Sequence, residues 1–166
     1  MYDPNEIIIN GDVAEIVLCG VYGEEVARTL IDVDDIEKCT PYHWALCGRY
    51  VTGTYRGEKT PIGRFILNIT DKKIYCDHID RNPLNNRKSN LRPSNPSQNA
   101  MNVGVTRRNK SGYKGVYYGQ GCWNVSICVD RKIIHSCGYK TSEEAALKYN
   151  ELAKQYHGEF AYINQT

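Results

Sequence analysis

The sequence of 166 residues contains no apolar run of about 18 residues, so no membrane-spanning helix is expected. Its first residues, Met1 to Glu6, lack the basic and apolar pattern of a secretory signal peptide. The seven cysteines are odd in number and form no Cys-x-x-Cys pair, which disfavours both a zinc ribbon and a disulfide framework. This cysteine usage fits a reducing cytosol, and most of the thiols are expected to be small buried hydrophobic groups.

The formal net charge of +2 conceals a strong asymmetry along the chain. Residues 76–140 hold 11 basic and 3 acidic side chains, a net charge of +8, whereas residues 1–75 and 141–166 carry −4 and −2. A merely solvated surface more often mixes the two signs. The central basic block is the charge pattern expected of a nucleic-acid binder.

One stretch, from Cys76 to Arg92, concentrates histidine, aspartate, asparagine and arginine, and Gln98-Asn99 follows it. A fold core does not need that density of polar side chains. Cleavage of a phosphodiester does, because it requires a base for water, an oxygen ligand for a hard cation and positive charge around the phosphate.

Within this stretch His78 is the candidate general base, because an imidazole with a pKa near about 6.5 accepts a proton at neutral pH. Asp77 is expected on the opposite face of the same strand, so it needs a local twist, or the approach of Asn99, to reach a metal. Magnesium prefers about six oxygen ligands and takes only one or two from protein, so Asp77 and Asn99 suffice for one ion. Asn90 is expected to tie the loop backbone and to orient His78.

Each of these residues taken alone also has an ordinary structural explanation. A lone histidine is more often a surface or hydrogen-bonded residue than a catalyst, and Asn-Pro and Asn-Asn are common turn sequences. The prediction of chemistry therefore depends on the joint pattern.

That joint pattern resembles the HNH homing endonucleases, specifically the branch with Asp-His-Ile-(Asp/Asn)-(Gly)-Asn-x-Leu-(Asp/Asn)-Asn-Arg-x-x-Asn-Leu-Arg followed by Gln-Asn. The matching residues are Asp77, His78, Ile79, Asp80, Asn82, Leu84, Asn86, Arg87, Asn90, Leu91, Arg92, Gln98 and Asn99. In that family the first His is the general base, the preceding Asp and the final Asn hold one divalent metal, and the middle Asn braces the base. The resemblance therefore implies these roles for His78, for Asp77 and Asn99, and for Asn90, with one Mg²⁺ or Mn²⁺ ion as cofactor.

Two positions depart from the family pattern. The usual glycine after the second acidic position is Arg81, which could tighten the loop or add a phosphate contact. Relatives often carry a histidine where Gly63 precedes Arg64-Phe65-Ile66-Leu67, so a DNA-contacting histidine is lost there although Arg64 remains.

The expected fold class is α+β. The predicted segments are a small β-rich N-terminal region (1–65), a ββα-metal HNH nuclease core (66–103), a basic linker (104–110), and a three-stranded antiparallel sheet plus helix (111–166). In the nuclease core, two short strands flank the Asn-rich loop and a short helix runs from Pro96 to Met101. His43 and Trp44 are interpreted as structural, because tryptophan usually packs.

The last segment resembles the ethylene-response-factor (Apetala-type) DNA-binding domain over about fifty residues. The matching residues are Ser111, Gly112, Gly115, Val116, Trp123, Gly138, Thr141, Glu143, Glu144, Ala145, Ala146 and Asn164. In that family a three-stranded sheet sits in the major groove, backed by a helix whose apolar face here would be Ala145, Ala146, Tyr149, Leu152, Ala153 and Tyr156. The alternative is a generic ββα domain in which Trp123 and the tyrosines only pack.

The leading hypothesis is a site-specific DNA endonuclease that acts as a monomer on double-stranded DNA and nicks one strand. The expected DNA contacts are Arg81, Arg87, Lys88, Arg92, Arg107, Arg108, Lys110, Lys114, Tyr117, Trp123, Arg131 and Lys132. The competing hypothesis is a DNA-binding regulator with a relic HNH motif, and the presence of all four motif residues favours the enzyme. A small zinc-binding structural module is disfavoured by the cysteine spacing. The expected location is the cytoplasm of a cell that hosts a phage or mobile element.

Overall fold

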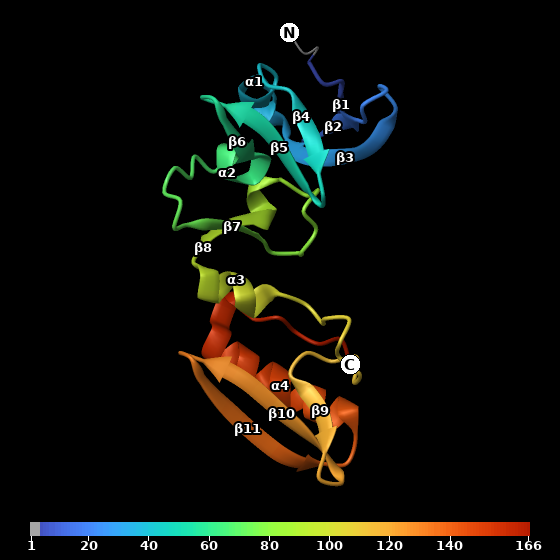
Figure 1. The fold of residues 1–166 in the computed structure, drawn as a ribbon, viewed down its shortest axis with the longest axis vertical. Coiled ribbons are helices and arrows are strands. Elements are labelled where there is room, and N and C mark those ends of the chain that lie inside the picture. The colour runs from blue at the N-terminus through green and yellow to red at the C-terminus, as the bar shows by residue number, and fades with distance from the viewer. Residues whose placement is uncertain (1–3) are drawn as a thin grey trace. The chain divides into compact units, whose positions relative to one another are not determined.

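The computed structural model describes residues 4–166 and divides the chain into two units, an N-terminal unit ending at Pro96 and a C-terminal unit from Ser97 to Thr166 (Figure 1). The fold is mixed α+β, with small antiparallel sheets and few helices. The sequence predicted this fold class. The division between the units falls inside the segment predicted as the nuclease core. The four predicted segments themselves stay a prediction.

The first sheet of the N-terminal unit consists of β1 (Ile7–Asn10), β2 (Val13–Cys19) and β3 (Glu25–Asp32), in that spatial order. A tight turn joins β1 to β2, and its Gly11 has φ +65°, a left-handed conformation that glycine adopts without steric cost. Ala14, Ile16 and Leu18 of β2 face the core, as expected of alternate residues in a strand, and Val17 between them is buried as well.

The second sheet consists of β4 (Trp44–Cys47), β5 (Tyr50–Tyr55) and β6 (Glu58–Pro61). Two short helical turns, η1 (Val33–Asp35) and α1 (Ile36–Cys39), precede it, and the five-residue helix α2 (Ile62–Ile66) follows it. The core of the unit joins both sheets and α2 through Ala14, Ile16, Leu18, Ile31, Cys39, Trp44, Val51, Ile62, Phe65, Ile66 and Leu91.

Trp44 confirms its predicted structural role, because it is buried and its Nε1 donates to the carbonyl of Cys39 at 3.0 Å. The side chain of Asn5 joins the two sheets at this point. Its amide nitrogen donates to the carbonyls of Val17 (2.8 Å) and Trp44 (2.9 Å), and its oxygen accepts from the Trp44 backbone nitrogen at 2.7 Å.

The predicted catalytic stretch forms a two-stranded hairpin in the N-terminal unit. Its strands are β7 (Tyr75–His78) and β8 (Leu91–Ser94), and the 3₁₀ turn η2 (Lys88–Asn90) leads into β8. The register pairs Asp77 with Arg92 and His78 with Leu91. The Asn-rich loop lies between the two strands, as predicted.

The C-terminal unit begins with α3 (Pro96–Asn102), whose first residue ends the N-terminal unit. Its antiparallel sheet consists of β9 (Val116–Gly119), β10 (Cys122–Val129) and β11 (Lys132–Tyr139), with β10 in the centre. Helix α4 (Ser142–His157) lies along one face of this sheet and is followed by the turn η3 (Gly158–Phe160) (Figure 1). The core between them contains Val116, Val125, Ile127, Ala145, Ala146, Tyr149 and Ala153.

Two sequence expectations about packing are wrong. Tyr156 was placed on the buried face of the last helix, but it is 41% exposed, and the buried positions near that end are Ala153 and His157. The cysteines were expected to be mostly buried, but only Cys39 is, and the exposed thiols are Cys19, Cys47, Cys128 and Cys137. All seven cysteines are free, in line with the expected lack of a disulfide framework.

Candidate active site

Asp77 and His78 are consecutive residues of β7, so their side chains leave opposite faces of the hairpin. Asp77 is buried and paired with Arg92 on β8. The guanidinium donates twice to the same carboxylate oxygen, from Nε at 2.9 Å and from Nη2 at 2.7 Å. Because the two side chains are only 6% and 11% exposed, this ion pair fixes the orientation of Asp77 within the hairpin.

The ring of His78 meets the side chain of Asn86, with 3.1 Å between His78 Nε2 and Asn86 Oδ1. Asn86 Nδ2 points the other way, to Thr29 Oγ1 at 2.9 Å and to the carbonyl of Pro83 at 3.1 Å. A carbonyl can only accept, so this contact fixes which end of the amide is the nitrogen. Asn86 Oδ1 therefore faces His78 and requires a hydrogen on Nε2, which leaves the lone pair of the neutral ring on Nδ1.

Asn90 ties the two ends of the loop together. Its oxygen accepts from the Asp80 backbone nitrogen at 2.9 Å, and its nitrogen donates to Asp80 Oδ1 at 2.9 Å and to the carbonyl of Asn85 at 2.8 Å. The backbone closes the same ring, because Ile79 donates to the carbonyl of Asn90 at 2.9 Å. Asn90 is buried, so these bonds are shielded from water and hold the loop shape beneath His78.

Asp80 organises the same loop from its carboxylate. Oδ1 accepts from the Asn82 backbone at 2.7 Å, and Oδ2 accepts from Asn85 Nδ2 at 2.8 Å. Burial raises the pKa of the Asp80 carboxyl, but the hydrogen bonds from Asn82, Asn85 and Asn90, together with the nearby His78, outweigh it and lower the pKa overall. Asp80 is thus a structural anion of the loop.

Arg81 occupies the position where the family usually has glycine, and its φ of +66° explains that preference. The left-handed conformation lets the Arg81 backbone nitrogen donate to the carbonyl of His78 at 2.9 Å, which closes the turn after β7.

The basic side chains at the end of the loop pair with acidic residues of the N-terminal region. Arg87 contacts Asp32 at 2.8 Å and Asp12 at 2.7 Å, and Lys88 contacts the buried Asp35 at 2.7 Å. Burial raises the pKa of Asp32, but the bonds from Arg87 and from the Lys88 backbone outweigh it and lower the pKa. With Arg92 on Asp77, three predicted DNA contacts therefore have intramolecular partners.

Gly63 and Arg64 of α2 both make contacts within the N-terminal unit. A Cβ on Gly63 would lie 2.9 Å from Cys76 Sγ and 3.1 Å from Asn86 Oδ1, so the helix backbone packs directly against the residue that holds His78. Arg64 donates to the carbonyls of Ile74, of Asp71 (3.0 Å) and of Ile69 (3.3 Å), which fastens the loop before β7.

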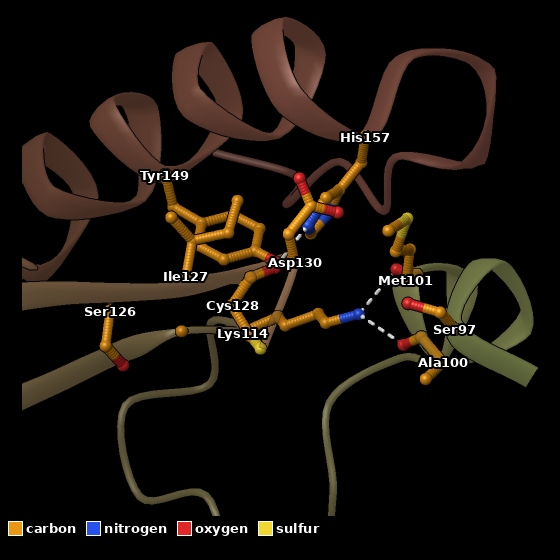
Figure 2. Close-up of a pocket in the computed structure, with 11 residues that line it drawn as sticks. Ser97, Ala100, Met101, Lys114, Ser126, Ile127, Cys128, Asp130, Tyr149 and His157 are labelled. Carbon is orange, nitrogen blue, oxygen red and sulfur yellow. Dashed lines mark hydrogen bonds between the residues drawn. The ribbon is translucent and has the colours of Figure 1, made fainter. Parts of the chain in front are cut away.

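In the C-terminal unit, Asn99 lies on α3, and the end of that helix is held by Lys114 (Figure 2). Lys114 Nζ donates to the carbonyls of Ala100 at 3.2 Å and Met101 at 2.6 Å, and it lies 5.5 Å from the centre of the Tyr162 ring. The last carbonyls of a helix have no partner within the helix, and a lysine is a common donor to them. Lys114 therefore caps α3.

Among the remaining residues predicted to contact DNA, some are exposed to solvent and one packs against the core. Arg107, Arg108, Lys110, Arg131 and Lys132 are exposed, and Arg131 lies in the β10–β11 turn with φ +65°. Tyr117 is 45% exposed on β9. Trp123 instead packs against the core beneath the sheet and contacts the Tyr118 ring edge-on, with 5.3 Å between ring centres. This packing matches the alternative in which Trp123 supports the sheet.

A pocket of about 220 Å³ lies in the C-terminal unit beside the end of α4 (Figure 2). It is lined by Ser97, Ala100, Met101, Lys114, Gly115, Ser126, Ile127, Cys128, Asp130, Tyr149 and His157. His157 Nε2 lies 2.9 Å from the carbonyl of Cys128, and its Nδ1 has no hydrogen-bond partner among the residues that the structure describes. The pocket is separate in sequence and unit from the hairpin that carries His78.

Comparison with known proteins identifies the family. Over 141 residues the chain is 33% identical to an HNH endonuclease of Acanthamoeba polyphaga mimivirus, and the match covers 81% of this chain and 73% of that protein. The chain belongs to the HNH endonuclease family. It is also 32% identical over 92 residues to Protein 3.8 of Escherichia phage T7, a match that covers 54% of this chain and 75% of that protein. No family model and no solved structure matches the chain.

Membership of the HNH endonuclease family indicates a nuclease. Among residues 4–166, no helix is long and apolar enough to cross a membrane.

The sequence missed two structural supports of this HNH site, Asn86 and Asp80. Both residues are in the motif, but their supporting roles depend on hydrogen-bond partners that the motif does not identify.

The donor chemistry of the predicted metal ligands suits a hard cation, because Asp77 offers a carboxylate and Asn99 an amide oxygen. Over the described part of the chain, no group of three or more His, Cys, Asp or Glu side chains could hold a metal. Each of the two is thus a chemically suitable ligand for Mg²⁺, which commonly takes most of its other ligands from water and phosphate.

Proposed function

We propose that the protein is a metal-dependent DNA endonuclease that cuts double-stranded DNA at specific sites, with His78 as the general base. The observation that carries the proposal is the contact of His78 Nε2 with Asn86 Oδ1 within the HNH motif. The contact places the hydrogen of the neutral ring on Nε2 and leaves the lone pair on Nδ1, where the ring can accept a proton. His78 is half-buried.

In the proposed reaction a water oxygen attacks phosphorus while its proton moves to Nδ1 of His78. The bond from phosphorus to one bridging oxygen breaks, and that oxygen leaves with its strand end. His78 needs a fixed orientation for this step, because proton transfer requires a hydrogen-bond distance to the attacking water. Asn90 and Asp80 support that orientation through the loop, and Asn86 supports it directly.

One divalent ion, Mg²⁺ or Mn²⁺, would be held by Asp77 and Asn99. When bound, such an ion stabilises the negative charge that develops on the phosphate. Arg92 orients Asp77 for this role through its two bonds to Oδ2. In this proposal Arg92 serves the metal site, and a direct DNA contact by this residue is not required.

We further propose that the C-terminal unit binds DNA as an Apetala-type domain. Two residues of that motif make the bonds that close the unit, which supports the resemblance. Asn164 Oδ1 accepts from the Lys114 backbone at 2.7 Å, and Ser111 Oγ donates to the carbonyl of Val116 at 2.8 Å. The exposed cations before the sheet (Arg107, Arg108 and Lys110) and at its β10–β11 turn (Arg131 and Lys132) supply phosphate contacts. A lone HNH site acts on one strand, so a nicking monomer is proposed.

The test incubates the purified full chain with phage or genomic DNA and MgCl₂ and maps the ends on both strands. We expect cuts at defined positions, mostly on one strand, that disappear in EDTA and in His78→Ala. His135→Ala, an exposed histidine of the C-terminal unit, is the matched control and should keep cutting. Sequence-specific binding with no metal-dependent cutting would favour the DNA-binding regulator, and cutting by His78→Ala would refute the assigned base.

A further inference from the structure

We propose that Thr29, on β3 of the N-terminal sheet, is a positioning residue of the nuclease: acting through Asn86, it fixes which nitrogen of the His78 ring accepts the proton. The inference rests on the proposed role of His78 as the base. It gives the N-terminal sheet a part in the active site, although that sheet lies outside the HNH motif.

The hydrogen bonds all donate in one direction, from His78 through Asn86 and Thr29 to the carbonyl of Leu84. The Thr29 hydroxyl donates its hydrogen to the carbonyl of Leu84 at 2.9 Å, so Oγ1 serves as acceptor for Asn86 Nδ2, also at 2.9 Å. Asn86 Oδ1 then accepts from His78 Nε2 at 3.1 Å. With these partners fixed, the neutral His78 ring carries its hydrogen on Nε2.

Burial makes this arrangement decisive. Thr29 is 0% exposed and Asn86 is 1% exposed, so water cannot replace a lost partner. Turning the Asn86 amide by half a rotation would set its oxygen against Thr29 Oγ1 and the Pro83 carbonyl, and its nitrogen against His78 Nε2. Unmade or repulsive contacts of buried groups are costly, so one amide orientation and one form of the neutral His78 ring are favoured.

The backbone holds Thr29 in place for this task. Leu30 donates to the carbonyl of Leu84 at 2.8 Å, and Asn86 donates to the carbonyl of Leu30 at 2.8 Å. Leu30, the neighbour of Thr29 in the chain, therefore binds the loop on either side of Asn85. These backbone bonds hold the loop beside β3 and bring Asn86 to Thr29.

Helix α2 supports the same amide from a second direction. Gly63 lies so close that a Cβ there would be 3.1 Å from Asn86 Oδ1. The absence of a side chain at Gly63 leaves room for the Asn86 oxygen. Asn86 therefore packs between β3 and α2, and Thr29 provides the hydrogen bond from the β3 side.

The experiment compares Thr29→Val, which has the same shape but no acceptor, with Thr29→Ser, which keeps the hydroxyl. Thr54→Val is the matched control, because Thr54 is an exposed residue of β5 in the same unit. Two readouts are used: the ¹⁵N shifts of the neutral His78 ring in the intact metal-free protein, assigned with His78→Gln, and the cleavage constants with Mg²⁺. The ring shifts report the position of the hydrogen without any contribution from activity.

In the wild type we expect the hydrogen on Nε2. Thr29→Val should show a mixture of both ring forms and lose about tenfold in kcat with KM changed less than about twofold, because ring orientation affects the chemical step and not DNA affinity. Thr29→Ser and Thr54→Val should match the wild type in ring form, with kcat within about threefold of it.

A wild-type ring with its hydrogen on Nδ1, or a Thr29→Val protein unchanged in ring form and kcat, would overturn the inference while leaving His78 as the base. Full cutting by His78→Gln would instead remove the proposed function, whatever the ring shifts show. The two failures are therefore distinguishable.

Discussion

Arg92 and Asp77 face each other across the β7–β8 hairpin, and both guanidinium contacts fall on one carboxylate oxygen, at 2.9 and 2.7 Å. The arrangement links a residue expected to contact DNA to the residue expected to hold the metal. Because both side chains are nearly buried, removing either charge takes this ion pair away from a side chain that is shielded from water.

Arg92→Met is therefore expected to lower the free energy of unfolding by about 3 kcal/mol, since it leaves the Asp77 carboxylate buried without its partner. The double variant Asp77→Leu/Arg92→Met should recover most of this loss. Arg87→Met is the control, because its ion pairs are more exposed and should contribute about 1 kcal/mol or less. Urea denaturation measures all three. An Arg92→Met protein of unchanged stability, with a weaker salt dependence of DNA binding, would instead make Arg92 a phosphate contact.

The stability of the protein should fall in acid because of Asp80 and Asp32. Burial raises the pKa of each carboxyl, but hydrogen bonds outweigh it and hold each folded-state pKa below the ordinary value of 3.8. A carboxyl with a lowered folded pKa stabilises the fold above its unfolded pKa and loses that contribution as the pH falls through the folded pKa. We expect a free energy of unfolding that declines as the pH drops below about 4.

Asp80→Asn should make that decline shallower, because one of the two titrating groups is removed. Asp34→Asn, which changes an exposed carboxylate of the same unit, is the control and should keep the wild-type slope. Urea denaturation from pH 6 to the acid limit measures the slope. If Asp80→Asn and the wild type declined in parallel, the Asp80 hydrogen bonds would contribute no pH-dependent stability.

Arg81→Gly is expected to raise the free energy of unfolding by about 1 kcal/mol, because a non-glycine residue at φ +66° carries steric strain. Arg107→Gly, at an exposed position outside the positive-φ residues, should lower stability slightly through the added freedom of the unfolded chain. Thermal unfolding of the two variants measures the difference. A destabilised Arg81→Gly protein would show that the arginine side chain contributes more than the backbone strain costs.

The elements found from the sequence are those whose signals are local. Helix α4 was predicted from Thr141 and the glutamates after it, and Thr141 Oγ1 indeed accepts from the Glu144 backbone at 3.1 Å. Strands β10 and β11 were predicted as runs of strand-forming residues separated by turn residues. Helix α2 was missed because it has five residues and no side-chain cap. Strand β3 was missed because its exposed Glu25 and Arg28 weaken the apolar pattern.

The candidate site shows the same dependence on local signals, because its supporting partners are remote in the sequence. The motif named His78 and Asn90 by spacing, yet the partner that orients Asn86 is Thr29, 57 positions earlier. The partners of Arg87 are equally remote, with Asp12 75 positions away. A local pattern predicts which charges are present and gives no information on which of them meet in the fold.

Lys114 was predicted to contact DNA, whereas in the structure its ammonium group binds the carbonyls at the end of α3. In Lys114→Met the carbonyls of Ala100 and Met101 lose their donor, so the amides of α3 should exchange hydrogen faster in the metal-free protein. Because Asn99 is on that helix, the Mg²⁺ concentration needed for cutting should rise about three- to tenfold. The salt slope of DNA binding should stay at the wild-type value, since no phosphate contact is lost. Lys110→Met is the control with the opposite pattern: its exposed cation precedes the sheet, so the slope should fall by about one while α3 exchange and the metal requirement stay constant. A Lys114→Met protein with a shallower salt slope and unchanged exchange in α3 would return Lys114 to the DNA surface.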